Sequence, residues 1–163
     1  MTAKELIASL NLSAHVEGGA FRETYRSAQV LYPEGYPGVR SAATAIYFLL
    51  QEGEFSAFHR ILSDEMWHHY TGDPLHIYEI DRNGKLIIHK LGKNLDDGEK
   101  FQLVIPGGSW FASRCEKPGG HTLAGCTVAP GFDFKDFELA DRAQLIQLFP
   151  EHAELINSMT YPQ

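Results

Sequence analysis

The chain has 163 residues, and its 21 acidic against 14 basic side chains give a formal net charge of −7 at pH 7. This length suits a single domain with its own core, and an acidic chain lacks the basic stripes that sequence-independent binding to nucleic acid requires. No apolar run reaches the length of a membrane span and no signal segment is evident, so we expect one cytoplasmic domain spanning residues 1–163.

The N-terminal segment predicts a short helix followed by a strand. Thr2 and Glu5 have the spacing of a capping box in front of the apolar stripe of residues 3–10, which favours a helix there. A turn at Gly18–Gly19 precedes the segment FRETYRS. Alternation in this segment places Phe21, Glu23 and Tyr25 on one face and Arg22, Thr24 and Arg26 on the other. A period of two residues is typical of a strand.

The middle of the chain is a series of short apolar or alternating runs separated by turns. Residues 32–40 hold two prolines and two glycines, so we expect a loop there that could act as a lid. Strands are predicted at 41–50, 55–62, 65–72, 75–81, 85–92, 101–105, 109–114 and 121–129. Asn83–Gly84 is the strongest hairpin signal, and Pro106–Gly108 is a second tight turn.

The C-terminal third changes to a helical period. Apolar residues from Asp141 onward recur at helical spacing, and Pro150 stands where a second helix would begin, so helices are predicted over about 141–159. The body of about 17–134 has a turn every 8–12 residues. The fold class is therefore all-β with flanking helices, either an antiparallel sandwich or a barrel.

Polar chemistry is concentrated between Gly53 and Gly72. His59, Glu65, Trp67, His68 and His69 lie within eleven residues, and the flanking sequence is apolar and extended. Three imidazoles, a carboxyl group and an indole in such a setting indicate a lined cavity rather than a solvated surface. Cys115 and Cys126 do not form a zinc or disulfide pattern and are expected to be buried thiols.

The spacing within this stretch resembles the first motif of the cupin superfamily, G-x5-H-x-H-x3,4-E-x6-G. Gly53, His59, Glu65 and Gly72 match it, and Ile61 stands at the second histidine. The second motif, P-x-G-x2-H, is echoed by Pro106 and Gly108 and ends at Phe111. The segments VEGGAFRETYRS and GCTVAPGFDFKDFEL look like a small, single-domain, RmlC-like cupin family without an established function.

The resemblance implies a cupin double-stranded β-helix, a jelly-roll barrel. Metal-binding cupins hold an ion with three histidines and a glutamate, but Ile61 and Phe111 have no lone pair to donate. We therefore expect no metal and no cofactor. The alternative is a weak metal site formed by His59, Glu65 and His69.

Parity along the strand suggests which side chains share the interior. If Glu65 points inward, Trp67 and His69 do so too, and Met66, His68 and Tyr70 point outward. From this we predict His59, Glu65 and His69 as catalytic residues, with His59 as the nearest partner of Glu65. The predicted ligand-binding residues are Tyr47, Ile61, Trp67 and Phe111.

Several functions remain open at this stage. One is a metal-independent isomerase or epimerase of a sugar or other carbonyl metabolite, with a histidine as the base and a tyrosine as the acid. Another is a protein that binds a small ligand without turning it over, and a third is a metal-dependent cupin enzyme. The resemblance also implies a homodimer or higher homo-oligomer. The expected partner is a small molecule, and neither nucleic acid nor membrane is expected.

Overall fold

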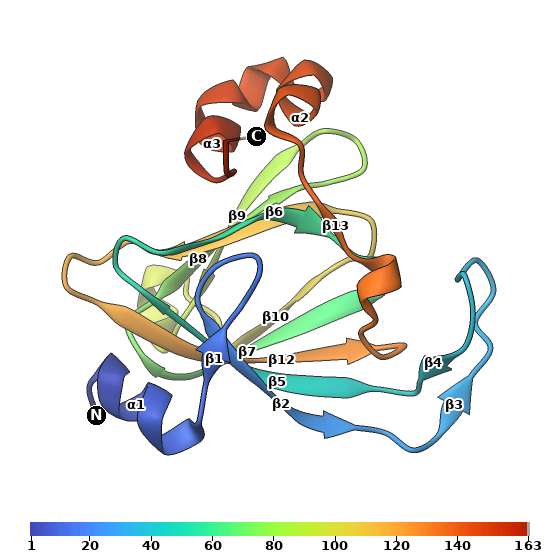
Figure 1. Cartoon of the computed structure of the whole chain (residues 1–163). Coiled ribbons are helices and arrows are strands. Elements are labelled where there is room, and N and C mark those ends of the chain that lie inside the picture. Colours follow the sequence, from blue (N-terminus) through green and yellow to red (C-terminus); the bar gives the residue numbers. More distant parts are fainter. Residues whose placement is uncertain (163) are drawn as a thin grey trace.

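Strand alternation produces two antiparallel sheets that face each other across an apolar interior (Figure 1). The protein is described here by a computed structural model that covers residues 1–162. The six-stranded sheet has the order β1 (Ser13–Ala14), β2 (Ala20–Arg26), β5 (Thr44–Gln51), β12 (His121–Ala129), β7 (Asp64–Gly72) and β10 (Gln102–Ile105). The five-stranded sheet has the order β13 (Glu138–Leu139), β6 (Phe55–Arg60), β11 (Trp110–Cys115), β8 (Leu75–Ile80) and β9 (Leu86–Leu91). This arrangement confirms the predicted jelly roll.

Helices lie outside the two sheets. They are α1 (Ala3–Leu10), α2 (Arg142–Leu148) and α3 (Ala153–Ser158), with short 3-10 turns at η1 (Leu95–Asp97), η2 (Phe134–Asp136) and η3 (Pro150–His152). The capping box of Thr2 and Glu5 begins α1 as predicted. The helix pair α2–α3 covers the outer face of the five-stranded sheet, whereas α1 packs on the outer face of the other sheet (Figure 1). None of the described helices combines the length and apolarity needed to cross a membrane.

The core between the sheets is filled by large apolar side chains. Phe48, Trp67 and Phe111 meet edge to face there, and each has at most 1% of its surface exposed. The hairpin predicted at Asn83–Gly84 joins β8 and β9. The turn at Pro106–Gly108 joins β10 to β11, but β10 pairs with β7 whereas β11 pairs with β6 and β8, so this turn carries the chain from one sheet to the other.

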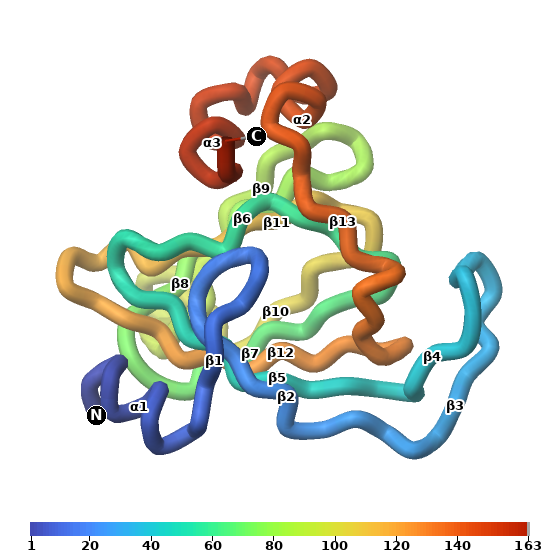
Figure 2. Tube along the Cα trace, viewed as in Figure 1, coloured from blue at the N-terminus to red at the C-terminus, as the bar shows by residue number. Residues whose placement is uncertain are grey.

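Two connecting segments lie at one end of the molecule. The segment of residues 32–40 forms the tip of a ribbon, β3 (Val30–Leu31) with β4 (Arg40–Ser41), that projects beyond the sheets (Figure 1). The chain between β12 and β13 instead runs from one sheet to the other, as the trace in Figure 2 shows.

Candidate functional site

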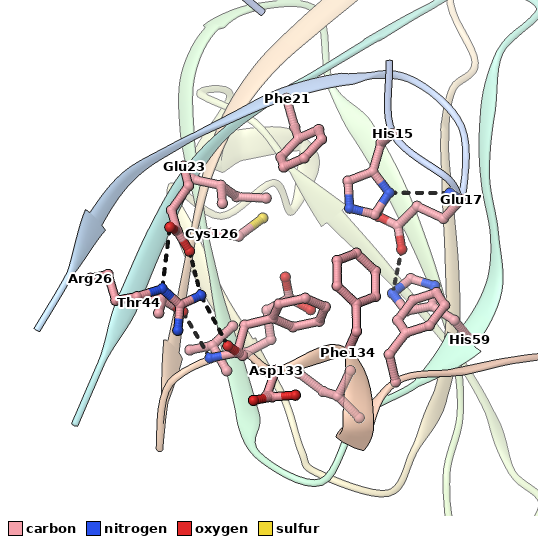
Figure 3. A pocket seen from close by; sticks show the side chains of 16 residues that line it. His15, Glu17, Phe21, Glu23, Arg26, Thr44, His59, Cys126, Asp133 and Phe134 are labelled. Carbon is pink, nitrogen blue, oxygen red and sulfur yellow. Dashed lines mark hydrogen bonds and ion pairs between the residues drawn. The ribbon is translucent and has the colours of Figure 1, made fainter. Parts of the chain in front are cut away.

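A cavity of about 530 Å³ opens between the two sheets, next to the segment that joins β12 to β13 (Figure 3). This size falls in the usual range of small-molecule sites. Its apolar wall consists of Phe21, Ile46, Ile61, Val128, Phe132, Phe134 and Phe137. Its polar wall consists of His15, Glu17, Glu23, Arg26, Thr44, His59, Glu65, Cys126 and Asp133.

The central polar contact joins His59 on β6 to Glu17 in the turn before β2. His59 Nε2 lies 2.9 Å from Glu17 Oε2, and both residues are buried. The other ring nitrogen, Nδ1, lies 2.7 Å from the carbonyl oxygen of Ala57. Because both nitrogens face acceptors, this geometry favours the doubly protonated imidazolium. Glu65 acts on the His59 ring through its charge, as the predicted pairing of the two residues implies, but the direct contact of His59 is with Glu17. Parity along β7 could not reveal this carboxylate, because it comes from another segment.

Backbone contacts fix Glu17 in this position. Its carbonyl oxygen accepts hydrogen bonds from the Ala57 amide at 2.8 Å and from the Tyr161 hydroxyl at 3.2 Å. Gly18 follows with φ of 110°, and a Cβ at this position would lie 2.0 Å from the carbonyl oxygen of Phe55. Only glycine allows such an approach. The turn therefore brings the Glu17 carboxylate against β6.

The pair shifts the protonation of both partners. Burial alone would lower the pKa of His59, but the charge and hydrogen bond of Glu17, with smaller help from Glu65 and the Ala57 carbonyl, raise this pKa overall. Burial would likewise raise the pKa of Glu17, and the charge and hydrogen bond of His59 reverse the direction and lower it. An ionised carboxylate beside an imidazolium is the result.

His15 adds a donor to the same wall. Its Nδ1 accepts a hydrogen bond from the Glu17 amide at 3.1 Å, so the proton of the neutral ring is on Nε2. Burial is the main cause that lowers the pKa of His15, which keeps the ring neutral. The Nε2–H group faces the cavity, as the view in Figure 3 indicates.

Glu65 is the second carboxyl group of the cavity. Burial is the largest cause that raises its pKa to about 7, the charge of Glu17 raises it further, and His59 and a hydrogen bond with Cys126 lower it. At neutral pH the Glu65 carboxyl group therefore exists in both protonation states. In its neutral form it can donate a hydrogen bond or a proton to a ligand.

The cavity contains only part of the set of residues predicted from the sequence. His59, Glu65 and Ile61 line it. Trp67 and Phe111 point to the interior as parity predicted, but they pack in the core between the sheets and do not line the cavity. The ligand-binding role of both residues stays a prediction.

His69 and Tyr47 lie elsewhere. His69 is on β7 beyond Trp67, outside the cavity wall, and its Nε2 lies 3.2 Å from the carbonyl oxygen of Asp73. Tyr47 neighbours Ile46 on β5, and since Ile46 lines the cavity, alternation turns Tyr47 to the outer face, where it packs near α1 and against Tyr70. The expectation that the Tyr47 hydroxyl reaches the cavity is therefore wrong.

A β-bulge explains why Arg26 lines the cavity. Strand alternation predicts Arg26 on the face opposite Glu23, but the register of β2 against β5 shifts between Glu23 and Tyr25. The extra residue reverses the facing of the residues after the bulge, so Glu23 and Arg26 share the cavity side. Arg26 then forms a two-pronged contact with Glu23, at 2.6 and 3.2 Å.

Residues 130–137 form the apolar cover of the cavity. Phe132, Phe134 and Phe137 meet edge to face, and Phe137 also stacks on the His59 ring with centroids 5.4 Å apart. Arg26 Nη2 donates to the Phe132 carbonyl oxygen at 3.1 Å, and the Phe132 amide donates to Thr44 Oγ1 at 2.9 Å. We call this segment the aromatic cover.

The donors of this site do not fit the metal centre of other cupins. Across residues 1–162 no cluster of three or more histidine, cysteine, aspartate or glutamate side chains could hold a metal ion. Phe111 lies opposite His59 in the register of β11 against β6, so a phenyl ring occupies the space next to the imidazole. Both nitrogens of His59 already face acceptors, which leaves no lone pair for a metal.

Comparison with known proteins finds a matching family and a relative of similar sequence. The model of the family described as Cupin superfamily (DUF985) matches residues 4–140. An uncharacterized protein of Saccharomyces cerevisiae is 31% identical over 146 residues, which are 82% of this chain and 72% of the yeast protein.

Two solved structures are similar over nearly their whole length. A hypothetical protein from Leishmania major has a TM-score of 0.93 and 36% identity, and the match covers 99% of this chain and 100% of that one. The X-ray structure of a protein from Shewanella oneidensis has a TM-score of 0.92 and 39% identity, with coverage of 100% and 99%. Neither description names an activity, so function must be argued from the site.

Proposed function

This chain belongs to the DUF985 family of the cupin superfamily, and we propose that it is a metal-independent enzyme that moves a proton at the carbon next to a carbonyl group in a small metabolite. The observation that carries the proposal is a pair of carboxyl groups in one cavity whose pKa values are driven apart. The pKa of Glu17 is lowered by its contact with His59, whereas burial raises the pKa of Glu65 to about 7. Such a pair provides a base and an acid at the same pH.

Glu17 is the better candidate for the base. His59, the base expected from the sequence, has both nitrogens engaged, so it positions Glu17 and stabilises its negative charge. Glu17 Oε2 faces His59, whereas Oε1 lies 3.8 Å from His15 Nδ1, which is too far for a hydrogen bond, so Oε1 can still accept a proton. We assign Oε1 as the atom that accepts the proton from carbon.

The acid and the carbonyl donors come from two other residues of the cavity lining. The neutral Glu65 carboxyl group and the His15 Nε2–H would hydrogen-bond the substrate carbonyl oxygen. The C–H bond breaks, its proton moves to Glu17, and the proton of Glu65 moves to the carbonyl oxygen, which gives a neutral enol. Return of the proton from Glu17 to a carbon of the enol, with transfer of the enol O–H proton back to Glu65, restores the carbonyl group and yields an isomer or an epimer. The aromatic cover keeps water away from the enol.

Binding without turnover is the second candidate. The stacking of Phe137 on His59 and the aromatic cover favour binding without turnover, because an apolar wall retains a ligand. Exchange of carbon-bound hydrogen separates the two functions, since only the enzyme breaks a C–H bond.

The test measures deuterium exchange in D₂O by proton NMR, with benzylacetone and dihydroxyacetone as probes. The wild-type protein should accelerate loss of the α-hydrogen signal, and Glu17→Gln should reduce that acceleration by about 100-fold or more, the usual contribution of a positioned base. Glu34→Gln, at an exposed loop position, is the matched control and should leave exchange unchanged. Exchange that persists in Glu17→Gln would overturn the assignment, and no exchange with either probe would favour binding alone.

A further inference from the structure

Both positively charged side chains of the cavity wall, Arg26 and His59, are already paired with carboxylates of the same wall. Glu23 holds the Arg26 guanidinium with contacts of 2.6 and 3.2 Å, and the Phe132 carbonyl oxygen takes a further hydrogen bond from Arg26 at 3.1 Å. Glu17 is held by His59 at 2.9 Å. Within residues 1–162, Arg26 and His59 are the cavity-lining side chains that carry a positive charge, so no unpaired cation faces the ligand space.

Asp133, another acidic residue of the wall, also has a counter-ion. Asp133 lies 3.8 Å from Arg40, which is buried and makes a two-pronged contact with Asp136 at 2.6 and 2.7 Å. The rest of the wall consists of aromatic and aliphatic side chains together with the His15 ring, the Thr44 hydroxyl, the Cys126 thiol and the Glu65 carboxyl group. An anionic ligand brought into this space would lose water and find both positively charged side chains already paired, which is unfavourable. A cationic ligand would also lose water and would meet only the Glu65 carboxyl group, whose neutral form is favoured by burial.

From this pairing we infer that the ligand is uncharged, with an apolar or aromatic body and a single carbonyl-type acceptor as its polar head. The body fits the phenyl-lined wall formed by Phe21 and the aromatic cover, and the acceptor meets the donors of His15 and Glu65. Phosphorylated sugars, nucleotide sugars and carboxylic acids are disfavoured by the same argument, because each carries a negative charge. The carbonyl head group in this inference rests on the proposed function. The absence of a ligand charge is inferred from the ion pairs of the cavity wall and does not depend on catalysis.

The test compares three probes of nearly the same shape and different charge. Benzylacetone is neutral, 3-phenylpropanoate replaces its methyl group with an anionic oxygen, and 3-phenylpropylamine is cationic. Binding to the wild-type protein is measured at neutral pH by isothermal titration calorimetry and by ligand-observed NMR. The neutral ketone should bind about tenfold or more tightly than either charged probe, because each charged probe would lose its hydration without compensation.

The variant Glu23→Gln should weaken the preference for the neutral ketone over the anion. Glu23→Gln removes the partner of Arg26 and leaves a guanidinium free at the cavity wall, so affinity for 3-phenylpropanoate should rise by about tenfold with little change for benzylacetone. Glu138→Gln frees Arg60 from a similar ion pair outside this cavity and is the matched control, with no change for any probe.

The outcomes separate this inference from the proposed function. Wild-type binding of the anion or the cation that equals or exceeds that of the ketone would overturn the inference, as would no binding of any probe. Either result would leave the catalytic proposal intact if the wild-type protein accelerates deuterium exchange and Glu17→Gln still abolishes that acceleration. Conversely, the wild-type protein could prefer the neutral probe while deuterium exchange persists in Glu17→Gln. In that case the inference about ligand charge holds and only the assignment of Glu17 as the base is wrong.

Discussion

His59 Nε2 and Glu17 Oε2 lie 2.9 Å apart, although β6 and the turn before β2 are distant in the chain. Both side chains are nearly excluded from solvent, so each charge depends on the other for compensation. The contact also decides the chemistry of the cavity. It occupies the histidine that cupin metal sites use, and it keeps a carboxylate ionised in an apolar space.

The first prediction is that Glu17→Gln destabilises the protein and lowers the pKa of His59. His59 has a raised folded pKa, so its contribution is full below the unfolded value and is lost as the pH rises through the folded value. Glu17 has a lowered pKa, so its contribution is present above the unfolded value and is lost as the pH falls through the folded value. Between those limits, near pH 6, the variant should lose about 3–5 kcal/mol of unfolding free energy, the cost of leaving a buried charge unpaired.

Urea denaturation measures that loss, and NMR titration of the imidazole measures the pKa of His59. The exposed pair Arg60–Glu138 supplies the control, since Glu138→Gln should change stability by less than about 1 kcal/mol. An unchanged His59 pKa in Glu17→Gln would show that the pair does not set the protonation of the ring.

The second prediction concerns metals. Protein purified without chelator should carry substoichiometric iron, manganese, zinc and nickel by elemental analysis, and added metal should not raise the melting temperature. The reason is the donor set: Ile61 and Phe111 cannot ligate, and both nitrogens of His59 are engaged. A stoichiometric metal that is lost in His59→Ala would contradict this.

The third prediction is that Arg26 fastens the aromatic cover. Its guanidinium joins Glu23 on β2 to the Phe132 carbonyl oxygen, so Arg26→Gln should increase hydrogen–deuterium exchange across residues 130–137. Arg22→Gln is the matched control on the same strand, because Arg22 instead contacts the Leu10 carbonyl oxygen at 3.2 Å. Equal exchange of this segment in both variants would show that the contacts of Thr44 and Arg40 suffice to hold it.

The fold could be predicted from local signals that the structure retains. Capping at Thr2, the hairpin at Asn83–Gly84 and strand alternation each depend on neighbours in sequence, so they are evident without knowledge of distant partners. The inward facing of Glu65 was predictable for the same reason.

The rest of the site depends on contacts between distant segments. Glu17 sits in a turn with no periodicity of its own, and its role arises only because Gly18 allows the chain to approach β6. The bulge in β2 reversed the facing of Arg26, which alternation alone could not anticipate. The one sequence signal for Glu17 was its place inside VEGGAFRETYRS, a segment that carried the family resemblance.

The last prediction is that Glu65→Gln stabilises the protein at alkaline pH. The folded pKa of Glu65 is about 7, above the ordinary value of 4.5, because the buried carboxyl group resists ionisation. The folded state therefore binds this proton more tightly than the unfolded state. The stability that this provides is full below the unfolded pKa and is lost as the pH rises through about 7.

An isosteric amide stays neutral at every pH, so Glu65→Gln escapes that loss. Near pH 8 the variant should exceed the wild-type unfolding free energy by up to about 3 kcal/mol, and the two proteins should converge at about pH 4, below the unfolded pKa. Urea denaturation at both pH values measures the difference. A variant less stable than the wild type near pH 8 would mean that the ionised Glu65 carboxylate is the form that the folded cavity stabilises. In that case Glu65 could not serve as the acid opposite Glu17, because the cavity would then hold two carboxylates and no proton to donate to the carbonyl oxygen.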